Sequence, residues 1–416
     1  MVDGAGLLVQ ELAGTYTAPF DDPRGWRDGL IGLMASLDRA VRHRIGAMAV
    51  DGTSGTLLLC GADGRLLDGP LALALPYHRS CPDHRAAVAQ LLRDDPGAQG
   101  PAASSSGSLA RALHLMELAG ASMQAATKTM LLRHQADWIS GWLLNDWSQG
   151  EAGNNVRLGW DLQRCRWAGR IGQQPWATAL PRIQPSGSVL GAMPEAVARL
   201  LGLPQGCWVV AGSTDANAAV LAAQPSEGDG IAVLGTTLVL KQRVNAPIDG
   251  PGISCHRVGG CWIAGGASNT GAGILRRFFG DQQLKELSRQ IDPRRPSGLQ
   301  LRPLMRTGER FPVDDPALEP VLEPRPVSDA LYLQALLEGL TAIERAGWQR
   351  LAACGAPPLQ RVISLGGGAV NPQWRALREQ ALGVPVLNRP RLTAALGMAQ
   401  LARVSMGDLP LAIRHE

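Results

Sequence analysis

One stretch near the end of the chain has the composition of a loop that could hold a nucleotide: Ser364-Leu-Gly-Gly-Gly-Ala-Val-Asn-Pro-Gln-Trp374. The apolar residues 362–365 predict a strand, and Trp374 and Leu377 predict that a helix follows the glycines. Glycines let the backbone turn tightly and approach a ligand closely, because no Cβ intervenes. A strand that delivers such a loop to a helix N-terminus can bind phosphates or adenosine. Gly-rich turns also serve packing, so the pattern alone leaves both interpretations open.

A single carboxylate is placed where it could act on a hydroxyl group. Asp215 ends the segment Gly212-Ser-Thr-Asp215, between a predicted strand at 207–211 and a predicted helix at 216–223. A carboxylate beside a buried strand is costly unless it is paired or functional. It could take the proton from a hydroxyl nucleophile. The alternative is that Asp215 simply caps the helix, a role that Asp fills well.

Two turns rich in glycine and threonine occur, one in each half of the chain. They are Asp51-Gly-Thr-Ser-Gly-Thr56 and Gly235-Thr236-Thr237. Backbone N–H groups and hydroxyls in such turns can hold a phosphate or a sugar. Each turn alone could be an ordinary tight turn, but their recurrence favours a functional role. Trp374, at the mouth of the third loop, could pack in the core or stack on adenine.

The elements that must position these residues predict an α/β protein of two domains. The 416 residues exceed one ordinary core, and a content of 45% hydrophobic and 18% charged residues is typical of globular proteins. We expect domains at residues 1–206 and 207–403, followed by a tail at 404–416. Strands are expected at 6–18, 45–50, 57–60, 207–211, 231–234, 237–241, 261–264 and 362–365. Helices are expected to begin at Pro23 and to span 109–120, 216–223 and 329–353.

Composition argues against several other classes of protein. The net charge of +4 includes no basic block with interleaved aromatics, so nucleic-acid binding is not expected. Seven scattered cysteines without C-x-x-C suit a reducing cytosol, and the histidines show no H-x-x-x-H metal spacing. No run of 18 apolar residues predicts a membrane span, and the N-terminus lacks signal-peptide character. A Walker A motif and a G-x-G-x-x-G motif are also absent.

Taken together, the motifs resemble the FGGY family of carbohydrate kinases, and most closely the branch of D-ribulose and xylulose kinase-like proteins of plants and cyanobacteria. The likeness runs from about residue 20 to residue 403. The matching segments are Asp51-Gly-Thr-Ser-Gly-Thr56, Ala211-Gly-Ser-Thr-Asp215, Leu234-Gly-Thr-Thr237, Gly265-Gly-Ala-Ser-Asn269, Gly308-Glu-Arg-Phe-Pro312 and Gly366-Gly-Gly-Ala-Val-Asn-Pro-Gln-Trp374. The last three motifs, in this order, are specific.

The resemblance implies an actin- and hexokinase-like, ribonuclease H-like fold, in which two α/β domains face an interdomain cleft. It implies transfer of the γ-phosphoryl group of ATP to a sugar hydroxyl with Mg²⁺. The reaction that we expect converts D-ribulose to D-ribulose 5-phosphate. Asp215 would be the catalytic base, would contact the sugar and would help to hold Mg²⁺. Such chemistry is mostly positioning and charge neutralisation. We expect a cytoplasmic (or plastid-stroma-like) monomer or homodimer whose partners are a pentulose and ATP.

The other binding residues follow from the same resemblance. The phosphate loop would comprise Gly235, Thr236 and Thr237. Ser54 would contact the sugar. The adenosine pocket would be formed by Gly367, Gly368, Asn371 and Trp374.

The chain departs from the family in two places. Family members begin with a strand that carries Asp-x-Gly-Thr; Val2-Asp-Gly-Ala5 does not match it, and residues 51–56 align with a later segment. We therefore expect about 25–30 residues, roughly two strands, to be missing, through a misassigned start or a native truncation. Arg79 stands where the family has an acidic sugar contact. Glu151 could compensate, or could be a solvated loop residue.

Three hypotheses of function remain after these departures. The first is a pentulose kinase, with D-xylulose as the alternative to D-ribulose. The second is an N-terminally truncated pseudokinase that binds nucleotide or sugar without efficient transfer. The third is an actin- or chaperone-like ATPase of the same superfamily, against which the lack of a long extension after residue 403 argues.

Overall fold

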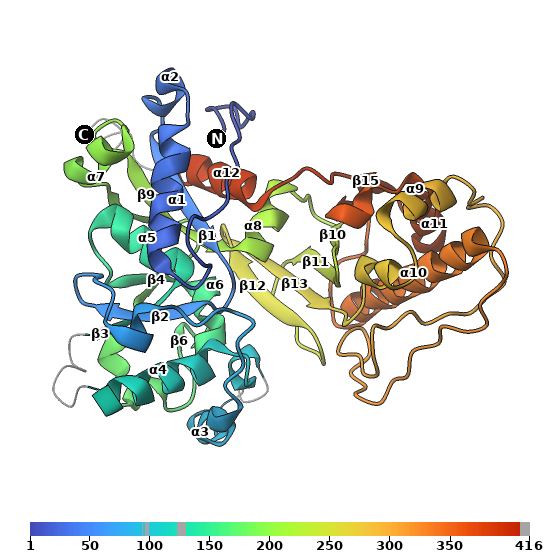
Figure 1. Ribbon diagram of the computed structural model, residues 1–416, viewed down its shortest axis with the longest axis horizontal. Helices are drawn as coiled ribbons and strands as arrows, with labels where there is room; N and C mark the ends of the chain where they lie inside the picture. The colour runs from blue at the N-terminus through green and yellow to red at the C-terminus, as the bar shows by residue number, and fades with distance from the viewer. Residues whose placement is uncertain (94, 96–99, 123–129, 408–416) are drawn as a thin grey trace. The chain divides into compact units, whose positions relative to one another are not determined.

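The computed structural model describes residues 1–93, 95, 100–122 and 130–407. The chain divides into two compact units, coloured along the chain in Figure 1. Unit 1 comprises Met1–Ala222, Arg257–Gly260 and the chain from Thr393 onward; unit 2 comprises Ala223–His256 and Cys261–Leu392. The division therefore differs from the expected boundaries at 206 and 403, because the strand and helix at 208–222 pair and pack within unit 1. Of the expected tail, residues 408–416 lie outside the described residues.

Unit 1 combines short strands with helices. Its helices are α1 (Pro23–Ala35), α2 (Arg39–Arg42), α3 (Arg85–Leu91), α4 (Ser108–Ser122), α5 (Gln135–Leu144), α6 (Ala152–Asn155), α7 (Glu195–Leu201), α8 (Asp215–Ala222) and α12 (Ala394–Gly407). Its strands are β1 (Ala47–Gly52), β2 (Leu57–Gly61), β3 (Met130–His134), β4 (Gln149–Glu151), β5 (Trp160–Asp161), β6 (Arg166–Trp167), β7 (Arg182–Gln184), β8 (Val189–Ala192) and β9 (Trp208–Thr214).

The sheet that organises unit 1 has the order β1-β9-β8. β1 and β9 are parallel, with Asp51 opposite Ser213 and Gly52 opposite Thr214, whereas β8 and β9 are antiparallel. β9 is almost wholly buried, which fits its continuous run of small and apolar residues. β2 does not return to β1 but pairs antiparallel with β3 in a separate sheet. The strands expected at 45–50, 57–60 and 207–211 are thus confirmed.

The first helix begins where the sequence predicts it. Asp22 is the N-cap, its side chain accepts a hydrogen bond from the Arg24 N–H, and Pro23 is the first helical residue. Trp26 is buried and meets the ring of Trp138 edge-on. The strand expected at 6–18 is wrong: these residues, all described, make no more than an isolated bridge. Apolar sequence alone cannot form a strand where no neighbouring strand offers an edge.

Helices α8 and α12 pack together in unit 1 with their backbones in close contact (Figure 1). An added Cβ at Gly397 of α12 would lie 1.9 Å from the carbonyl oxygen of Ala218 in α8. Ala218, Met398 and Leu401 form the small apolar cluster at this contact. Gly397 is therefore the residue that allows the two helices to approach.

Unit 2 contains a six-stranded sheet of order β12-β13-β11-β10-β14-β15. Its strands are β10 (Asp229–Leu234), β11 (Leu238–Val244), β12 (Ser254–Val258), β13 (Cys261–Ala267), β14 (Arg361–Leu365) and β15 (Val386–Asn388), and its helices are α9 (Asp281–Ser288), α10 (Asp329–Ala353) and α11 (Pro372–Leu382). β10, β14 and β15 are parallel neighbours, whereas β10, β11 and β13 are antiparallel ones. The predicted helix 329–353 is confirmed, and it buries Leu333, Leu336, Leu337 and Leu340 in the core of this unit. No described helix combines the length and hydropathy needed to cross a membrane.

The contact between α8 and α12 generates a prediction about stability. Gly397→Ala should lower the free energy of unfolding by about 1–3 kcal/mol, because the methyl group would collide with backbone that cannot move aside easily. The matched control is Gly32→Ala in α1, where an added Cβ meets no atom within 4 Å. That change should stabilise by about 0.5–1 kcal/mol, the usual gain of alanine over glycine in a helix. Urea unfolding followed by circular dichroism measures both, and shifts of the same sign would contradict the packing described.

Candidate active site

Two carboxylates of unit 1 lie at the same edge of the parallel β1–β9 pair. Asp51 is at the end of β1, and Asp215 follows the last residue of β9 as the first residue of α8. The carboxyl ends of parallel strands meet at one edge of a sheet, which is where α/β proteins place their sites. Asp215 is half-buried, and one carboxylate oxygen accepts a hydrogen bond of 2.7 Å from the Ala216 N–H. Asp215 is thus a residue of the first turn of α8 whose carboxylate lies at the edge of the sheet.

The protonation of both carboxylates is shifted. Burial and the nearby negative charge of Asp215 raise the pKa of Asp51 to about 6. Burial also raises the pKa of Asp215, against the opposing effect of the Ala216 N–H. A carboxylate with a raised pKa is a better proton acceptor near neutral pH. Two close carboxylates with raised pKa values also suit a divalent cation with oxygen ligands.

The turn after β1 is held in place by buried polar groups. Gly55 has φ +101°, and the Thr56 N–H donates to the Thr53 carbonyl across the turn that contains Ser54. Arg111 of α4 is fully buried and donates 2.9 Å hydrogen bonds to the carbonyls of Gly55 and Arg79. The Ser54 turn is thereby tied to the segment that contains Arg79.

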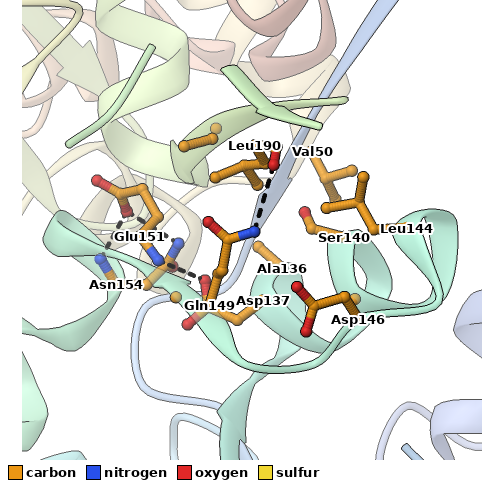
Figure 2. Close-up of a pocket in the computed structure, with 14 residues that line it drawn as sticks. Val50, Ala136, Asp137, Ser140, Leu144, Asp146, Gln149, Glu151, Asn154 and Leu190 are labelled. Carbon is orange, nitrogen blue, oxygen red and sulfur yellow. Dashed lines mark hydrogen bonds between the residues drawn. The ribbon is translucent and has the colours of Figure 1, made fainter. Parts of the chain in front are cut away.

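Behind the sheet edge lies a group of buried acids around a small cavity (Figure 2). The cavity has a volume of about 10 Å³, room for roughly one water molecule. Glu151 is 3% exposed and accepts hydrogen bonds from the Gly153 and Asn154 N–H groups, so it is an N-cap and not a solvated loop residue. Burial raises its pKa to about 8. Both carboxylate oxygens of Glu151 accept hydrogen bonds from the protein, and the cavity beside them has room for only about one water molecule. Glu151 is therefore not placed to contact a sugar.

Unit 2 carries a larger pocket of about 580 Å³. Six residues predicted to bind a nucleotide line this pocket, together with three basic side chains. The predicted residues are Gly235, Thr236, Gly367, Gly368, Asn371 and Trp374, and the basic ones are Arg276, Lys285 and Arg289. Thr237 is not among the lining residues. Glycine backbone beside basic side chains is an arrangement that suits a phosphorylated ligand.

A buried carboxylate supports the glycine-threonine turn of this pocket. Glu309 is 3% exposed and accepts hydrogen bonds from the Ser268 hydroxyl (2.5 Å) and the Asn269 N–H (2.7 Å). The Ser268 N–H in turn donates to the carbonyl of Leu238, directly after the turn. The adjoining Gly271 and Gly273 pack so closely on Thr236 and Thr237 that a Cβ would not fit.

Two of the residues predicted to bind adenosine make hydrogen bonds within the protein. Asn371 caps α11: its side-chain oxygen accepts from the Gln373 and Trp374 N–H groups, and its amide donates to Ser288. Trp374 is 3% exposed, and its indole N–H donates to Thr341 in the core. The ring therefore forms the floor of the pocket and offers no open face for stacking on a base. Burying this large aromatic side chain against α10 is more favourable than leaving its ring exposed to a ligand.

The residues that sequence reasoning missed are the buried charged groups behind the loops. Arg111 interrupts the apolar run of α4, a signal that could have been read. The sequence marks Asp51 only as part of a turn rich in glycine and threonine. Arg378 of α11 pairs with Glu344 of α10 at 2.5 Å and donates to Ser364, with Arg378 and Glu344 both 1% exposed. This pairing spans 34 residues and leaves no local pattern.

Comparison with known families finds a match in the second half of the chain. Residues 232–406 match the C-terminal domain of the FGGY family of carbohydrate kinases. The match contains all three motifs around the pocket of unit 2: residues 235–237, 265–269 and 366–374.

Solved structures of sugar kinases resemble the whole chain. A ligand-bound xylulose kinase from Lactobacillus acidophilus matches with TM-score 0.77 at 16% identity, over 99% of this chain and 87% of that one. A xylulose kinase from Rhodospirillum rubrum matches with TM-score 0.76 at 22% identity, over 96% and 85%. A Plasmodium falciparum glycerol kinase with ADP matches with TM-score 0.77 at 14% identity, over 99% and 88%. These likenesses confirm the predicted two-domain actin- and hexokinase-like fold, and with the family match they support a sugar kinase.

The raised pKa of Asp51 predicts how stability depends on pH. Between the ordinary value of 3.8 and about 6, the folded protein binds this proton more tightly than the unfolded chain does. Stability from this group is therefore lost as the pH rises through that window. At pH 7.5, Asp51→Asn should raise the free energy of unfolding by about 1–2 kcal/mol, a value reduced for the partial exposure of the carboxylate.

Urea unfolding at several pH values measures this difference between variant and wild type. The difference should vanish below pH ~3.8, where the carboxyl is protonated in both states. A stabilisation that does not change with pH would mean that the substitution acts through packing and not through charge.

Proposed function

We propose that this protein is an ATP-dependent carbohydrate kinase that phosphorylates a pentulose, with D-ribulose as the first candidate. The observation that carries the proposal is the pocket of unit 2. It joins the glycine backbones of residues 235 and 367–368 to basic side chains, within a segment that matches the kinase C-terminal domain. D-Xylulose is the second candidate, favoured by the xylulose kinases among the structural neighbours.

The nucleotide would be bound by the backbone of two glycine loops. Gly235 and Thr236 follow β10, Gly367 and Gly368 follow β14, and these two strands are parallel neighbours. The loops after them therefore emerge at the same edge of the sheet. Backbone N–H groups there would cradle phosphate oxygens, and Arg276 or Lys285 would neutralise their charge.

Asp215 would act on the sugar. Its carboxylate is half-buried, has a raised pKa and is held by the first turn of α8, so it could accept the proton of the attacking hydroxyl. Ser54, on the turn anchored by Arg111, would help to orient the sugar.

Asp215 and Asp51 would together hold Mg²⁺. Two carboxylates at one strand edge, close enough for one to raise the pKa of the other, are a hard-oxygen donor set that fits this ion. When bound, Mg²⁺ would neutralise the charge of the phosphates. A cation shared by Asp51 and Asp215 would also offset the repulsion between these two acidic groups.

The test of the proposal is ADP release, coupled to an optical readout, with D-ribulose, D-xylulose, glycerol and no sugar. Asp215→Asn should lower sugar-dependent ADP release by about 100-fold or more, because the proton acceptor is lost. ATP binding should be nearly unchanged. The control is Asp68→Asn, an exposed carboxylate of unit 1, which should retain full activity.

Each alternative has its own outcome in this assay. Turnover of Asp215→Asn within a few-fold of wild type would remove Asp215 as the base. ADP release that ignores every sugar would favour an ATPase. Nucleotide binding without any turnover would favour the pseudokinase.

A second prediction tests the pocket separately from the chemistry. An added Cβ at Gly367 meets no atom within 4 Å, so Gly367→Leu should fold normally and project into the space that the nucleotide needs. Affinity for ATP, measured by calorimetric titration, should fall by roughly tenfold or more. The control is Gly120→Leu in α4, which is equally uncrowded but lies in unit 1. Equal ATP affinity in both variants would place the nucleotide elsewhere.

A further inference from the structure

Three potential metal ligands of unit 1 converge beside helix α4, and neither the sugar chemistry nor the nucleotide pocket uses them. His84 ends the short 3₁₀ turn Pro82–His84. His114 and Glu117 lie three residues apart on α4, and residues at that spacing share one face of a helix. One ligand atom from each of the three side chains lies within 4.8 Å of the other two.

The distances between these three side chains are longer than those of good hydrogen bonds. The Nε2 atom of His84 lies 3.4 Å from Nδ1 of His114 and 3.4 Å from a carboxylate oxygen of Glu117. Both exceed the common range of about 2.7–3.2 Å for an N–H donor. One imidazole nitrogen carries at most one proton, so it cannot donate to both neighbours. Hydrogen bonding therefore explains at most one of these two approaches, and weakly.

The same distances suit ligands that share one metal ion. With metal–ligand bonds of about 2.0–2.2 Å, two ligands of a tetrahedral zinc ion lie about 3.3–3.6 Å apart. Two imidazoles and one carboxylate are a donor set that zinc uses, with a fourth position left for water or another ligand. The carboxylate supplies a negative charge that two neutral imidazoles lack.

The exposure of the three side chains also suits a binding site, because two are partly buried and the third is open to solvent. The side chain of His84 is 14% exposed, His114 is half-buried, and the side chain of Glu117 is 71% exposed. The rings of His84 and His114 are 5.5 Å apart between centroids and meet nearly edge-on. The two histidines are thus partly enclosed and in contact with each other, whereas the carboxylate faces the solvent from which an ion would arrive.

We propose that His84, His114 and Glu117 form a Zn²⁺-binding site that ties the turn at Pro82–His84 to helix α4. The ion joins residues 30 positions apart in the chain, so its binding stabilises the folded form of unit 1. The three side chains take no part in the proposed kinase chemistry. Helix α4 also carries Arg111, which holds the Ser54 turn, so the site braces the helix on which that turn depends.

The experiment is titration of the metal-free full-length protein with ZnCl₂, followed by calorimetry and by metal analysis after dialysis. We expect one equivalent of Zn²⁺ to bind and the melting temperature to rise. His114→Ala should weaken the affinity by roughly 100-fold, and Glu117→Gln by roughly tenfold, because each removes a ligand. Co²⁺ in place of Zn²⁺ should give the visible absorption of a tetrahedral site in the wild type and lose it in His114→Ala.

Two controls keep the proposal falsifiable. His43→Ala removes an exposed histidine at the end of α2 and should leave the affinity unchanged. Glu117→Gln changes a largely exposed side chain, so it tests the site even if His114→Ala does not fold. Failure of the wild type to retain stoichiometric Zn²⁺ would overturn the proposal, and so would affinities of both ligand variants within twofold of the wild type.

Discussion

The parallel pairing of β1 with β9 is the constraint on which the proposed chemistry of unit 1 depends. It sets Asp51 opposite Ser213 and so brings Asp51 and Asp215 to one edge. The pairing has a steric condition, because a Cβ at Gly212 would lie 1.8 Å from the carbonyl oxygen of Val50. A side chain there would push the strands apart. Glycine in the Gly212-Ser-Thr-Asp215 motif is thus explained by strand packing, and Asp215 inherits its position from it.

In each unit, a glycine-rich loop is held in position by buried charged groups. Glycine lets the backbone of such a loop approach a ligand closely, but the loop then has few side chains that can pack and hold it in place. Each is anchored from behind by a buried charged group whose hydrogen bonds are made to the loop or its neighbours: Arg111 in unit 1 and Glu309 in unit 2. The Arg378–Glu344 pair plays the same part for the helix after Gly368. Breaking such a buried pair by removing one partner costs about 3–5 kcal/mol.

The acids of unit 1 divide by their surroundings into an enclosed set and a solvent-accessible set. Glu151 is fully enclosed, caps α6 and has a pKa near 8, so its neutral form is favoured where no ligand can reach it. Asp51 and Asp215 are only half-buried and lie at the strand edge, where a cation or a hydroxyl can approach. Burial raises the pKa in all three, but access to solvent separates their roles.

Local patterns in the sequence determined the predicted helices, the predicted strands other than that at 6–18, and the glycine-rich loops. The periodic leucines of α10 and the Asp22-Pro23 cap of α1 specify those helices through contacts within a few residues, and the order strand, glycines, helix at 361–382 is equally local. The predicted strand at 6–18 failed because a strand also needs a distant partner.

The tertiary structure alone decided what those elements contact. It assigned β9 and α8 to unit 1, turned Trp374 into the floor of a pocket and used Asn371 as a cap. It also brought His84 to His114, although the histidines show no metal-binding spacing in the sequence. The physical reason is that such contacts depend on which sheet edges and helix faces meet after the chain has closed long loops, and no local pattern of residues encodes that choice.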